Sequence, residues 1–265
     1  MDWPLGEVCS ALSQKIPSFK AQVVSSIDST NTELMRRAKQ GLTQPFLLVA
    51  EEQTAGKGRL GRVWHAKTGD SLTFSIGLNL RMQDWSGFSL VVGMGILRGL
   101  DPKGEHGIGL KWPNDLWTGP VQSARKLAGI LIESSISQSQ NTREPDTRYC
   151  VIGVGININA PKNIDLKRPA VGMNELESSA NASSVLLAVV PHIIENTLRF
   201  EANGFEEFQS EYSRYDILQG QQVLMSNGVT GRASGVNSRG ELMIQTTSGV
   251  VPVISDEVSL VGLGV

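Results

Sequence analysis

The stretch LTFSIGLNL, residues 72–80, alternates strictly between large apolar side chains and smaller or polar ones. This period of two is that of a β-strand with an apolar face, and it is the clearest strand pattern in the chain. Apolar runs predict further strands at residues 46–50, 108–112, 115–117, 127–133 and 149–158. Apolar periodicity predicts helices at residues 5–16, 88–100, 183–202 and 205–215. Thr30 and Glu33 have the spacing of a capping box, which predicts a further helix to about Lys39. The pattern indicates a mixed α/β domain over about residues 21–215.

The chain changes character after Tyr215. Asn-Gly, Arg-Gly and Ser-Gly dipeptides, which favour turns, separate short β-rich runs at residues 222–225, 229–234, 242–246, 250–254 and 258–261. Strands at this spacing predict a small barrel or meander. We therefore expect one domain over residues 1–215 and a small C-terminal β domain over residues 216–265.

Composition narrows the classes of function. The 265 residues carry a formal net charge of -2, with 40% hydrophobic and 19% charged residues, so the chain lacks the basic footprint of a nucleic-acid binder. Two cysteines without framework spacing indicate free thiols in a reducing compartment. The sequence has neither a signal-peptide pattern nor an apolar run long enough to cross a membrane, so we expect a cytoplasmic location. The three histidines lack the spacing of a zinc site.

The loop QTAGKGRLGR, residues 53–62, combines glycines with a lysine and two arginines. Such a loop can bring backbone N–H groups close to phosphate oxygens while the cations neutralise them. Gly56, Gly58 and Gly61 also fit G-x-G-x-x-G, the dinucleotide-binding pattern, but that pattern needs a following helix and the next residues look extended. A solvated basic hairpin is the alternative, and composition alone does not separate the two.

Three further segments carry candidate polar groups. KWPND, residues 111–115, places oxygen donors at the exit of a proline turn, where they suit either Mg²⁺ or ordinary turn chemistry. Lys126 opens an apolar strand, as a point charge for a phosphate or as an edge charge. Gly153 and Gly155 indicate close approach by a ligand or another backbone, and Asn157 needs partners in a ligand site or a structural amide network.

Taken together and in this order, these motifs resemble the catalytic domain of the biotin protein ligases, also called biotin–[acetyl-CoA-carboxylase] ligases. The matching stretches are residues 28–31 (DSTN), 53–64, 111–116, 126–133 and 153–157. The resemblance implies an α+β fold of the class II biotin/lipoate ligase type. In that fold a mixed β-sheet with helices on one side is followed by a small SH3-like β-barrel. Only about 20 residues precede the first motif, too few for the family's frequent helix-turn-helix domain, so we expect no DNA binding.

The resemblance also implies a biotin pocket. Ser29, Thr30 and Asn31 would surround the biotin ring, because hydroxyls and amides supply the donors and acceptors that a ureido group needs. Gln53 and the backbone at Gly58 would line the same pocket.

The resemblance further implies charged and aromatic groups for ATP. Arg59 and Lys126 would hold the biotin carboxylate and the α-phosphate, and Trp64 would stack on the adenine. Asp115 and Asn157 would serve Mg²⁺, phosphate or the incoming lysine, with Asp115 as the metal ligand. The expected catalytic residues are Arg59, Lys126, Asp115 and Asn157. The other residues expected to bind biotin or ATP are Lys57, Arg62, Lys111, Asn114 and Gly129.

The implied reaction joins biotin to ATP, giving biotinyl-5′-AMP, and then transfers biotin to a lysine of a biotin carboxyl carrier protein domain. ATP, Mg²⁺ and biotin are the expected small molecules, and a homodimer through a sheet edge is compatible with the sequence. A lipoate–protein ligase is the nearest alternative, and a non-catalytic biotin-binding or scaffold protein is an alternative of another class. Lys57 stands where many relatives carry arginine, and the connection from Trp117 to Arg125 looks longer than typical.

Overall fold

The structure is a computed structural model that describes residues 2–136, 147–161 and 169–261. Its internal contacts divide the chain into two compact units. The first unit comprises Met1–Gln83, Ala128–Lys162 and Val171–Pro191, and the second comprises Asp84–Leu127, Asn163–Ala170 and His192–Val265. The domain boundary that we expect near residue 215 rests on the change in sequence pattern after Tyr215 and not on contacts. It stays a prediction.

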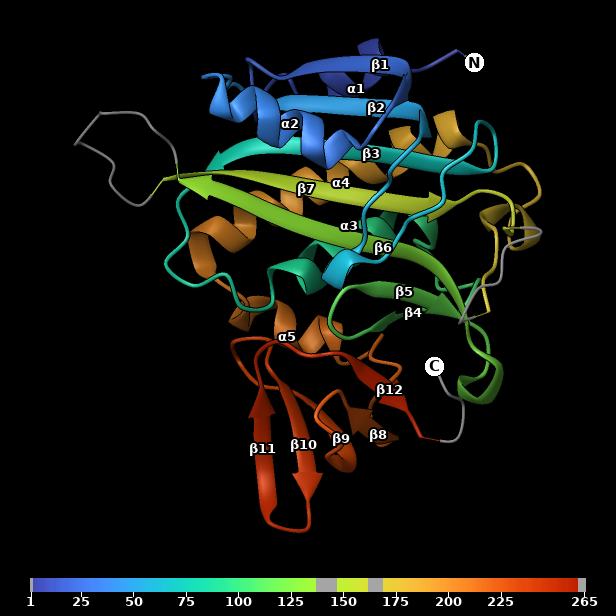
Figure 1. The fold of residues 1–265 in the computed structure, drawn as a ribbon, viewed down its shortest axis with the longest axis vertical. Coiled ribbons are helices and arrows are strands. Elements are labelled where there is room, and N and C mark those ends of the chain that lie inside the picture. The colour runs from blue at the N-terminus through green and yellow to red at the C-terminus, as the bar shows by residue number, and fades with distance from the viewer. Residues whose placement is uncertain (1, 137–146, 162–168, 262–265) are drawn as a thin grey trace. The chain divides into compact units, whose positions relative to one another are not determined.

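The first unit is built on a mixed sheet with strand order β1-β2-β3-β7-β6 (Figure 1). Its strands are β1 (Lys20–Ile27), β2 (Phe46–Gln53), β3 (Ser71–Leu80), β7 (Arg148–Asn157) and β6 (Arg125–Ile136), of which β6 enters the unit at Ala128. The pairing of β1 with β2 is parallel, whereas β2–β3, β3–β7 and β7–β6 are antiparallel. The mixed sheet that the sequence predicted is therefore confirmed.

Helices cover both faces of this sheet, whereas the family resemblance implied helices on one side. Helix α2 (Thr30–Lys39) lies in front of the sheet in Figure 1, and α1 (Leu5–Leu12) lies behind it with the beginning of α4 (Ala182–Asn203). Leu34 of α2 packs into a cluster with Phe46, Leu48, Tyr149 and Val151. Nearly all of β3 is buried, including its small polar residues, because this second face is also covered.

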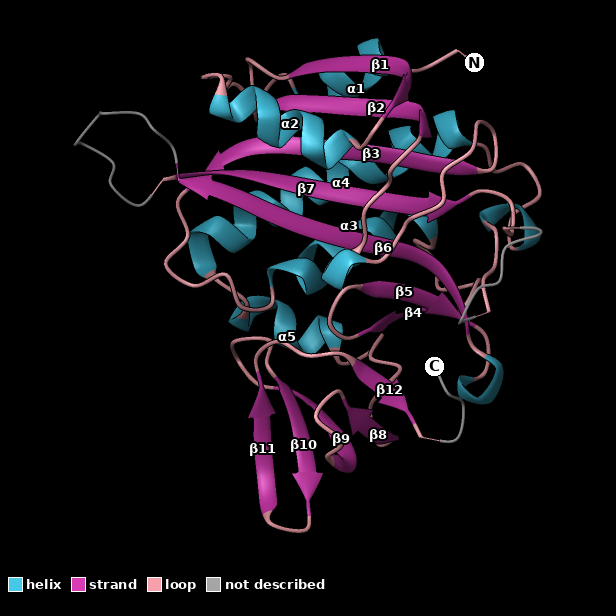
Figure 2. Cartoon of the chain, viewed as in Figure 1, coloured by secondary structure: helices cyan, strands magenta, loops and turns pink. Residues whose placement is uncertain are grey.

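The second unit combines a hairpin, helices and a separate antiparallel sheet. Strands β4 (Ile108–Lys111) and β5 (Asp115–Thr118) continue from the first residues of β6 in the order β6-β5-β4. The helices are α3 (Phe88–Leu100), α5 (Glu206–Tyr212) and the second half of α4. The second sheet has the order β11-β10-β9-β8-β12, and Figure 2 shows its short strands linked by turns.

This C-terminal sheet consists of β8 (Gln222–Met225), β9 (Thr230–Val236), β10 (Leu242–Thr246), β11 (Gly249–Val253) and β12 (Val258–Leu260). All of its pairings are antiparallel. Val223, Leu242 and Ile244 are fully buried in its core. Each strand agrees with its predicted range to within about two residues, which is the usual uncertainty of an element boundary. The fold class, a mixed sheet with helices and a small C-terminal β domain, is confirmed.

Two local expectations were incomplete. Strand β1 was missed because its sequence, KAQVVSSI, does not alternate cleanly, and several of its side chains are exposed at the sheet edge. Helix α2 has Ser29 as its N-cap, one residue before the expected capping box, because the Ser29 hydroxyl accepts a hydrogen bond from the Thr32 amide. The Ser-, Gln-, Asn- and Thr-rich sequence of residues 134–148 predicts an exposed loop, and most of this segment lies outside the described residues.

Within the ranges that the structure describes, no helix is both long enough and apolar enough to cross a bilayer. Short 3-10 turns occur at Arg59–Gly61, Val121–Ser123 and Met173–Glu175.

Candidate active site

The N-terminus of α2 gathers the polar residues expected around biotin. Ser29, Thr30 and Asn31 are almost fully buried, with 2–3% of their surface exposed. The Gln53 side-chain oxygen at the end of β2 accepts hydrogen bonds from the Thr30 amide (2.7 Å) and the Thr30 hydroxyl (3.1 Å). Two of the motifs singled out in the sequence, residues 28–31 and 53–62, thus meet in one polar cluster in the first unit, because the capped start of α2 lies against the sheet.

Ser75 joins this cluster and was not predicted. Its hydroxyl lies 2.7 Å from the Thr30 hydroxyl and 2.6 Å from the Asn31 side-chain oxygen. The Asn31 amide nitrogen donates to the Leu131 carbonyl (3.2 Å) and to the Glu133 carboxylate (2.9 Å). In the sequence, Ser75 lies on the face of residues 72–80 that carries the smaller and polar side chains. A hydroxyl on that face indicates a site only once the face is known to be buried.

Glycines of β7 make room for this cluster. A Cβ on Gly153 would lie 2.1 Å from the Asn31 side-chain oxygen, and one on Gly155 would lie 2.3 Å from the Trp64 indole. Gly155 stands opposite Gly129 in the β6–β7 register, so both strands lack side chains at that level. The close approach that the glycines predicted is therefore made, in the first unit, by Asn31 and Trp64.

The glycine-rich loop folds back on itself as a hairpin. The Gly58 amide donates to the Arg62 carbonyl (2.7 Å), and the Trp64 amide donates to the Gly56 carbonyl (2.9 Å). At the tip, Leu60 adopts a φ of 53° with 75% of its surface exposed, a conformation that non-glycine residues adopt at a cost.

The cations of this hairpin differ in exposure. Lys57 and Arg62 are exposed, whereas Arg59 is half-buried. The hairpin shape that the alternative interpretation expected is present, and the role of these cations toward phosphate stays a prediction. Asn157, buried to 5% exposure at the end of β7, stands opposite Ser71 of β3, and its assignment to phosphate also stays a prediction.

In the second unit, an ion pair joins two of the predicted catalytic residues. The Lys126 ammonium lies 2.7 Å from the Asp115 carboxylate, whose side chain is 9% exposed. The Lys126 amide donates to the Pro169 carbonyl (2.9 Å), which holds the start of β6. Lys126 is therefore more than an edge charge, because a largely buried carboxylate compensates it.

The remaining KWPND residues lie in different surroundings. Lys111 is buried, its ammonium donates to the Val258 carbonyl (2.6 Å), and it lies 5.5 Å from the centre of the Trp117 ring. Asn114 is half-buried in the turn between β4 and β5. The structure thus directs Lys111 toward the C-terminal sheet of the second unit, and its expected contact with ATP stays a prediction.

The donor set for Mg²⁺ is small. Among residues 2–136, 147–161 and 169–261, no three or more histidine, cysteine, aspartate or glutamate side chains gather as a metal-binding group. Asp115 offers one carboxylate, and one or two carboxylates together with substrate phosphates are what a Mg²⁺–nucleotide site usually uses. Asp115 therefore fits a metal that arrives with ATP better than a resident metal.

The two cysteines do not suit a nucleophilic role. Cys150 is buried in β7 and Cys9 is half-buried in α1, and both are free thiols. Burial raises the pKa of each thiol, which disfavours the reactive thiolate.

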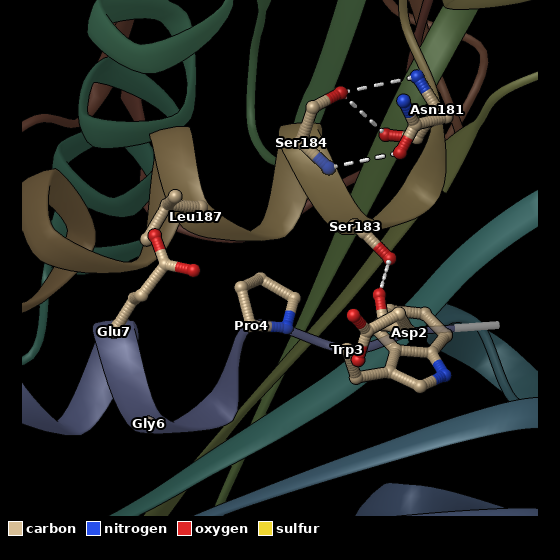
Figure 3. A pocket seen from close by; sticks show the side chains of 9 residues that line it. All are labelled: Asp2, Trp3, Pro4, Gly6, Glu7, Asn181, Ser183, Ser184 and Leu187. Atoms are coloured by element: carbon tan, nitrogen blue, oxygen red, sulfur yellow. Dashed lines mark hydrogen bonds between the residues drawn. The ribbon is translucent and has the colours of Figure 1, made fainter.

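A cavity of about 430 Å³ in the first unit lies away from all of the predicted residues. Figure 3 shows its lining at the starts of α1 and α4, where the Ser183 hydroxyl donates to the Asp2 carbonyl (2.7 Å). Asp2 and Glu7 contribute carboxylates, and none of the lining residues is cationic, so this cavity is poorly suited to phosphate. The lining residues are Asp2, Trp3, Pro4, Gly6, Glu7, Asn181, Ser183, Ser184 and Leu187.

Comparison with known families shows which family the chain belongs to. The model of the biotin/lipoate A/B protein ligase family matches residues 23–157, which is just over half of the 265 residues. The chain belongs to the biotin/lipoate A/B protein ligase family. All of the predicted site residues lie inside the matched range, whereas the C-terminal sheet lies outside it.

Curated members of this ligase family and solved structures are similar along most of the chain. "Bifunctional ligase/repressor BirA" of Bacillus subtilis is 27% identical over 250 residues, covering 90% of this chain and 72% of that protein. "Biotin--[acetyl-CoA-carboxylase] ligase" of Mycobacterium tuberculosis is 29% identical over 251 residues, covering 89% and 87%. The structure of a biotin protein ligase from Aquifex aeolicus in complex with biotin and ATP has a TM-score of 0.74 at 28% identity, covering 91% of this chain and 97% of that one.

Proposed function

We propose that this member of the family is a biotin protein ligase that forms biotinyl-5′-AMP from biotin and ATP and transfers biotin to a lysine of a biotin carboxyl carrier protein domain. The observation that carries the proposal is the buried hydroxyl and amide cluster of Thr30, Asn31, Gln53 and Ser75. The names of the similar ligases and the complex of the Aquifex aeolicus enzyme with biotin and ATP support it.

The chemistry of this cluster favours biotin over lipoate. The ureido group of biotin has two N–H donors and one carbonyl acceptor, which match side-chain oxygens such as that of Gln53 and hydroxyls such as that of Thr30. The dithiolane ring of lipoate has no such donors or acceptor, so it could not add hydrogen bonds to these groups, and a site built for hydrogen bonds discriminates against such a ligand.

In the first step, a biotin carboxylate oxygen attacks the α-phosphorus of ATP, and pyrophosphate leaves with the electrons of the broken P–O bond. Two anionic groups must meet, so we expect Arg59 and Lys126 to offset their repulsion and orient them. Lys57 and Arg62 would add positive charge at the loop, and Trp64 would contact the adenine. We expect Asp115 to hold Mg²⁺ when ATP is bound, and the ion would neutralise phosphate charge there.

In the second step, the uncharged ε-amine of the acceptor lysine attacks the acyl carbon of the mixed anhydride, an amide bond forms, and AMP leaves. Water competes with the amine for this anhydride. We therefore expect the hairpin of residues 53–64 to shield the intermediate, with Arg59 as its half-buried cation. Asn157 and Asp115 are the residues that we expect to orient the amine. Asn114, Lys111 and Gly129 complete the expected binding residues.

The test combines the full chain with ATP, Mg²⁺, biotin and a biotin carboxyl carrier domain, and mass spectrometry records the carrier. The proposal expects a gain of one biotinyl group that requires ATP. A gain only with lipoate and a lipoyl domain would move the substrate to the other branch of the family. Binding of biotin without any transfer would favour a non-catalytic biotin-binding protein. The cytoplasmic location, the homodimer and the lack of DNA binding stay predictions.

A further inference from the structure

The KWPND segment of the second unit is attached to the C-terminal sheet by two buried side chains. The Lys111 ammonium donates to the Val258 carbonyl of β12 (2.6 Å), and the Trp112 indole N–H donates to the Gly240 carbonyl (3.1 Å). Lys111 is 3% exposed and Trp112 is 2% exposed. Burying an ammonium and an indole N–H without such acceptors would be costly, so each contact constrains its residue.

The carbonyl that receives Trp112 belongs to a rigid turn between β9 and β10. The carboxylate of Glu241, which is 3% exposed, accepts from the Asn237 amide nitrogen (2.6 Å) and pairs with the Arg239 guanidinium (2.8 Å). Gly240 has a φ of 77°, and a Cβ there would lie 2.5 Å from the Gly87 Cα. The turn therefore has little freedom to move with Trp112.

The same hairpin is fixed along its outer edge. The Leu110 amide donates to the Tyr215 carbonyl (2.7 Å), and the Ile217 amide donates back to the Leu110 carbonyl (3.1 Å). The Ser89 hydroxyl at the start of α3 donates to the Pro113 carbonyl (2.7 Å). Residues just before the C-terminal sheet thus hold β4, and the start of α3 holds the turn that follows it.

Lys111 lies directly opposite Asp115 in the β4–β5 register. Side chains of directly opposed residues project from the same face of an antiparallel pair. The position of the Asp115 carboxylate, which pairs with Lys126 at 2.7 Å, therefore depends on the backbone that Lys111 and Trp112 hold.

We propose that Lys111 and Trp112 are positioning residues, which use Val258 and Gly240 of the C-terminal sheet to hold Asp115 against Lys126. The C-terminal sheet is then a part of the adenylation machinery, although it lies outside the segment that defines the family. This inference rests on the proposed function for its rate measurements.

The test uses the full chain with Trp112→Phe, which removes the indole N–H together with part of the ring, and Lys111→Met, which keeps an unbranched side chain without the ammonium. We expect the kcat for biotin-dependent pyrophosphate release to fall roughly 10- to 100-fold in each, because small displacements of positioned groups are costly. The biotin Kd should stay within about twofold, because the hydrogen bonds of the first-unit cluster are unchanged. Trp3→Phe is the matched control, because it also removes one indole hydrogen bond, to Glu51 (3.0 Å).

A double-mutant cycle separates positioning from general stability. In a Lys126→Ala background, either substitution should cost less than about threefold further, because the Asp115–Lys126 pair that it helps to position is already broken. An unchanged kcat in the single variants, or a loss repeated in full in the Lys126→Ala background, would overturn the proposal. Lys111→Met keeps the test valid if Trp112→Phe does not fold.

Amide hydrogen exchange decides the question independently of activity. Exchange at residues 111–118 should accelerate by at least about tenfold in Trp112→Phe but not in Trp3→Phe. Unchanged exchange there would sink the positioning role even if the native chain is an active ligase. Faster exchange in a chain that releases no pyrophosphate would sink the proposed function instead and leave the structural part of the inference standing.

Discussion

The polar cluster at the start of α2 and the Asp115–Lys126 pair satisfy their buried groups in different ways. The first consists mainly of neutral hydroxyl and amide groups that bond one another within the first unit. The second consists of opposite charges in the second unit, at 2.7 Å. A neutral cluster presents fixed donors and acceptors to a ligand, whereas an ion pair must exchange partners before its cation can bind a phosphate. Under the proposed function, the neutral cluster would provide selectivity and the charged residues would stabilise charge.

The largest effect on rate is expected from Lys126→Ala. The proposed function places Lys126 near the phosphate charge that develops in the reaction, so its removal should lower the rate of biotinyl-5′-AMP formation roughly 100- to 1,000-fold. Biotin affinity should fall much less than the rate, because only the expected contact of Lys126 with the biotin carboxylate is lost and the first-unit cluster keeps its hydrogen bonds. Pyrophosphate release and calorimetric titration with biotin measure the two quantities, and Lys103→Ala, an exposed lysine of the same unit, is the control. Equal losses in rate and biotin affinity would break the division between the two regions.

Gly153→Ala should reverse this pattern. The new Cβ would lie 2.1 Å from the Asn31 side-chain oxygen, so the start of α2 must shift. We expect biotin affinity to fall roughly 10- to 100-fold and the fold to lose about 1–3 kcal/mol. Titration calorimetry and thermal unfolding check both values. Gly6→Ala in α1 has open space around its Cβ and should leave biotin affinity unchanged.

Ser75→Ala probes the same cluster more gently. The change deletes one hydroxyl that bridges Thr30 and Asn31, without adding volume. Biotin affinity should fall about tenfold, the size expected from a lost buried hydrogen bond, while the kcat at saturating biotin stays within about threefold. Ser25→Ala on the exposed edge strand is the matched substitution. Wild-type affinity in Ser75→Ala would remove Ser75 from the site.

Asp216→Asn is the change with the smallest expected effect on the rate of biotinyl-5′-AMP formation. Its effect on the free energy of unfolding should be measurable. Burial raises the pKa of Asp216 from 3.8 to about 6, so the folded chain binds its proton more tightly than the unfolded chain. The protonated carboxyl therefore stabilises the fold below about pH 4, and this contribution is lost as the pH rises through about 6. Asp216→Asn should remove up to about 3 kcal/mol of this pH dependence from the free energy of unfolding. Denaturant melts from pH 4 to 7 test this expectation, and an unchanged slope would contradict it.

Much of the fold could be predicted from the sequence because its strands carry strong local patterns. Residues 72–80 alternate so regularly that only one strand assignment fits, and the Gly-containing turn dipeptides mark the C-terminal meander. The edge strand β1 was missed because half-exposed residues leave no period of two. The helices on both faces were missed because a local pattern does not show what covers the other face.

The candidate site could also be predicted only in part. Ser29, Thr30, Asn31 and Gln53 stand out in the sequence as a capped helix start and a loop entrance, and the structure brings all four into one buried cluster. Ser75 carries no motif, so only pairing between strands reveals it. The attachment of Lys111 to Val258 is harder still, because it joins residues 147 positions apart through a backbone carbonyl, and a sequence does not distinguish one carbonyl from another.

The order of the strands has a consequence for how the first unit is made. β3 lies between β2 and β7, but β7 ends at Asn157, 86 residues after β3 begins at Ser71. During synthesis, residues 20–80 can form β1, β2 and β3 while the far edge of β3 has no neighbour and its apolar residues have no cover. An unpaired apolar edge is a site for misassociation, so a nascent chain stalled before residue 148 should be a better chaperone substrate than one released after residue 157. β7, which supplies Gly153 and Gly155, is thus also the strand that pairs with the free edge of β3.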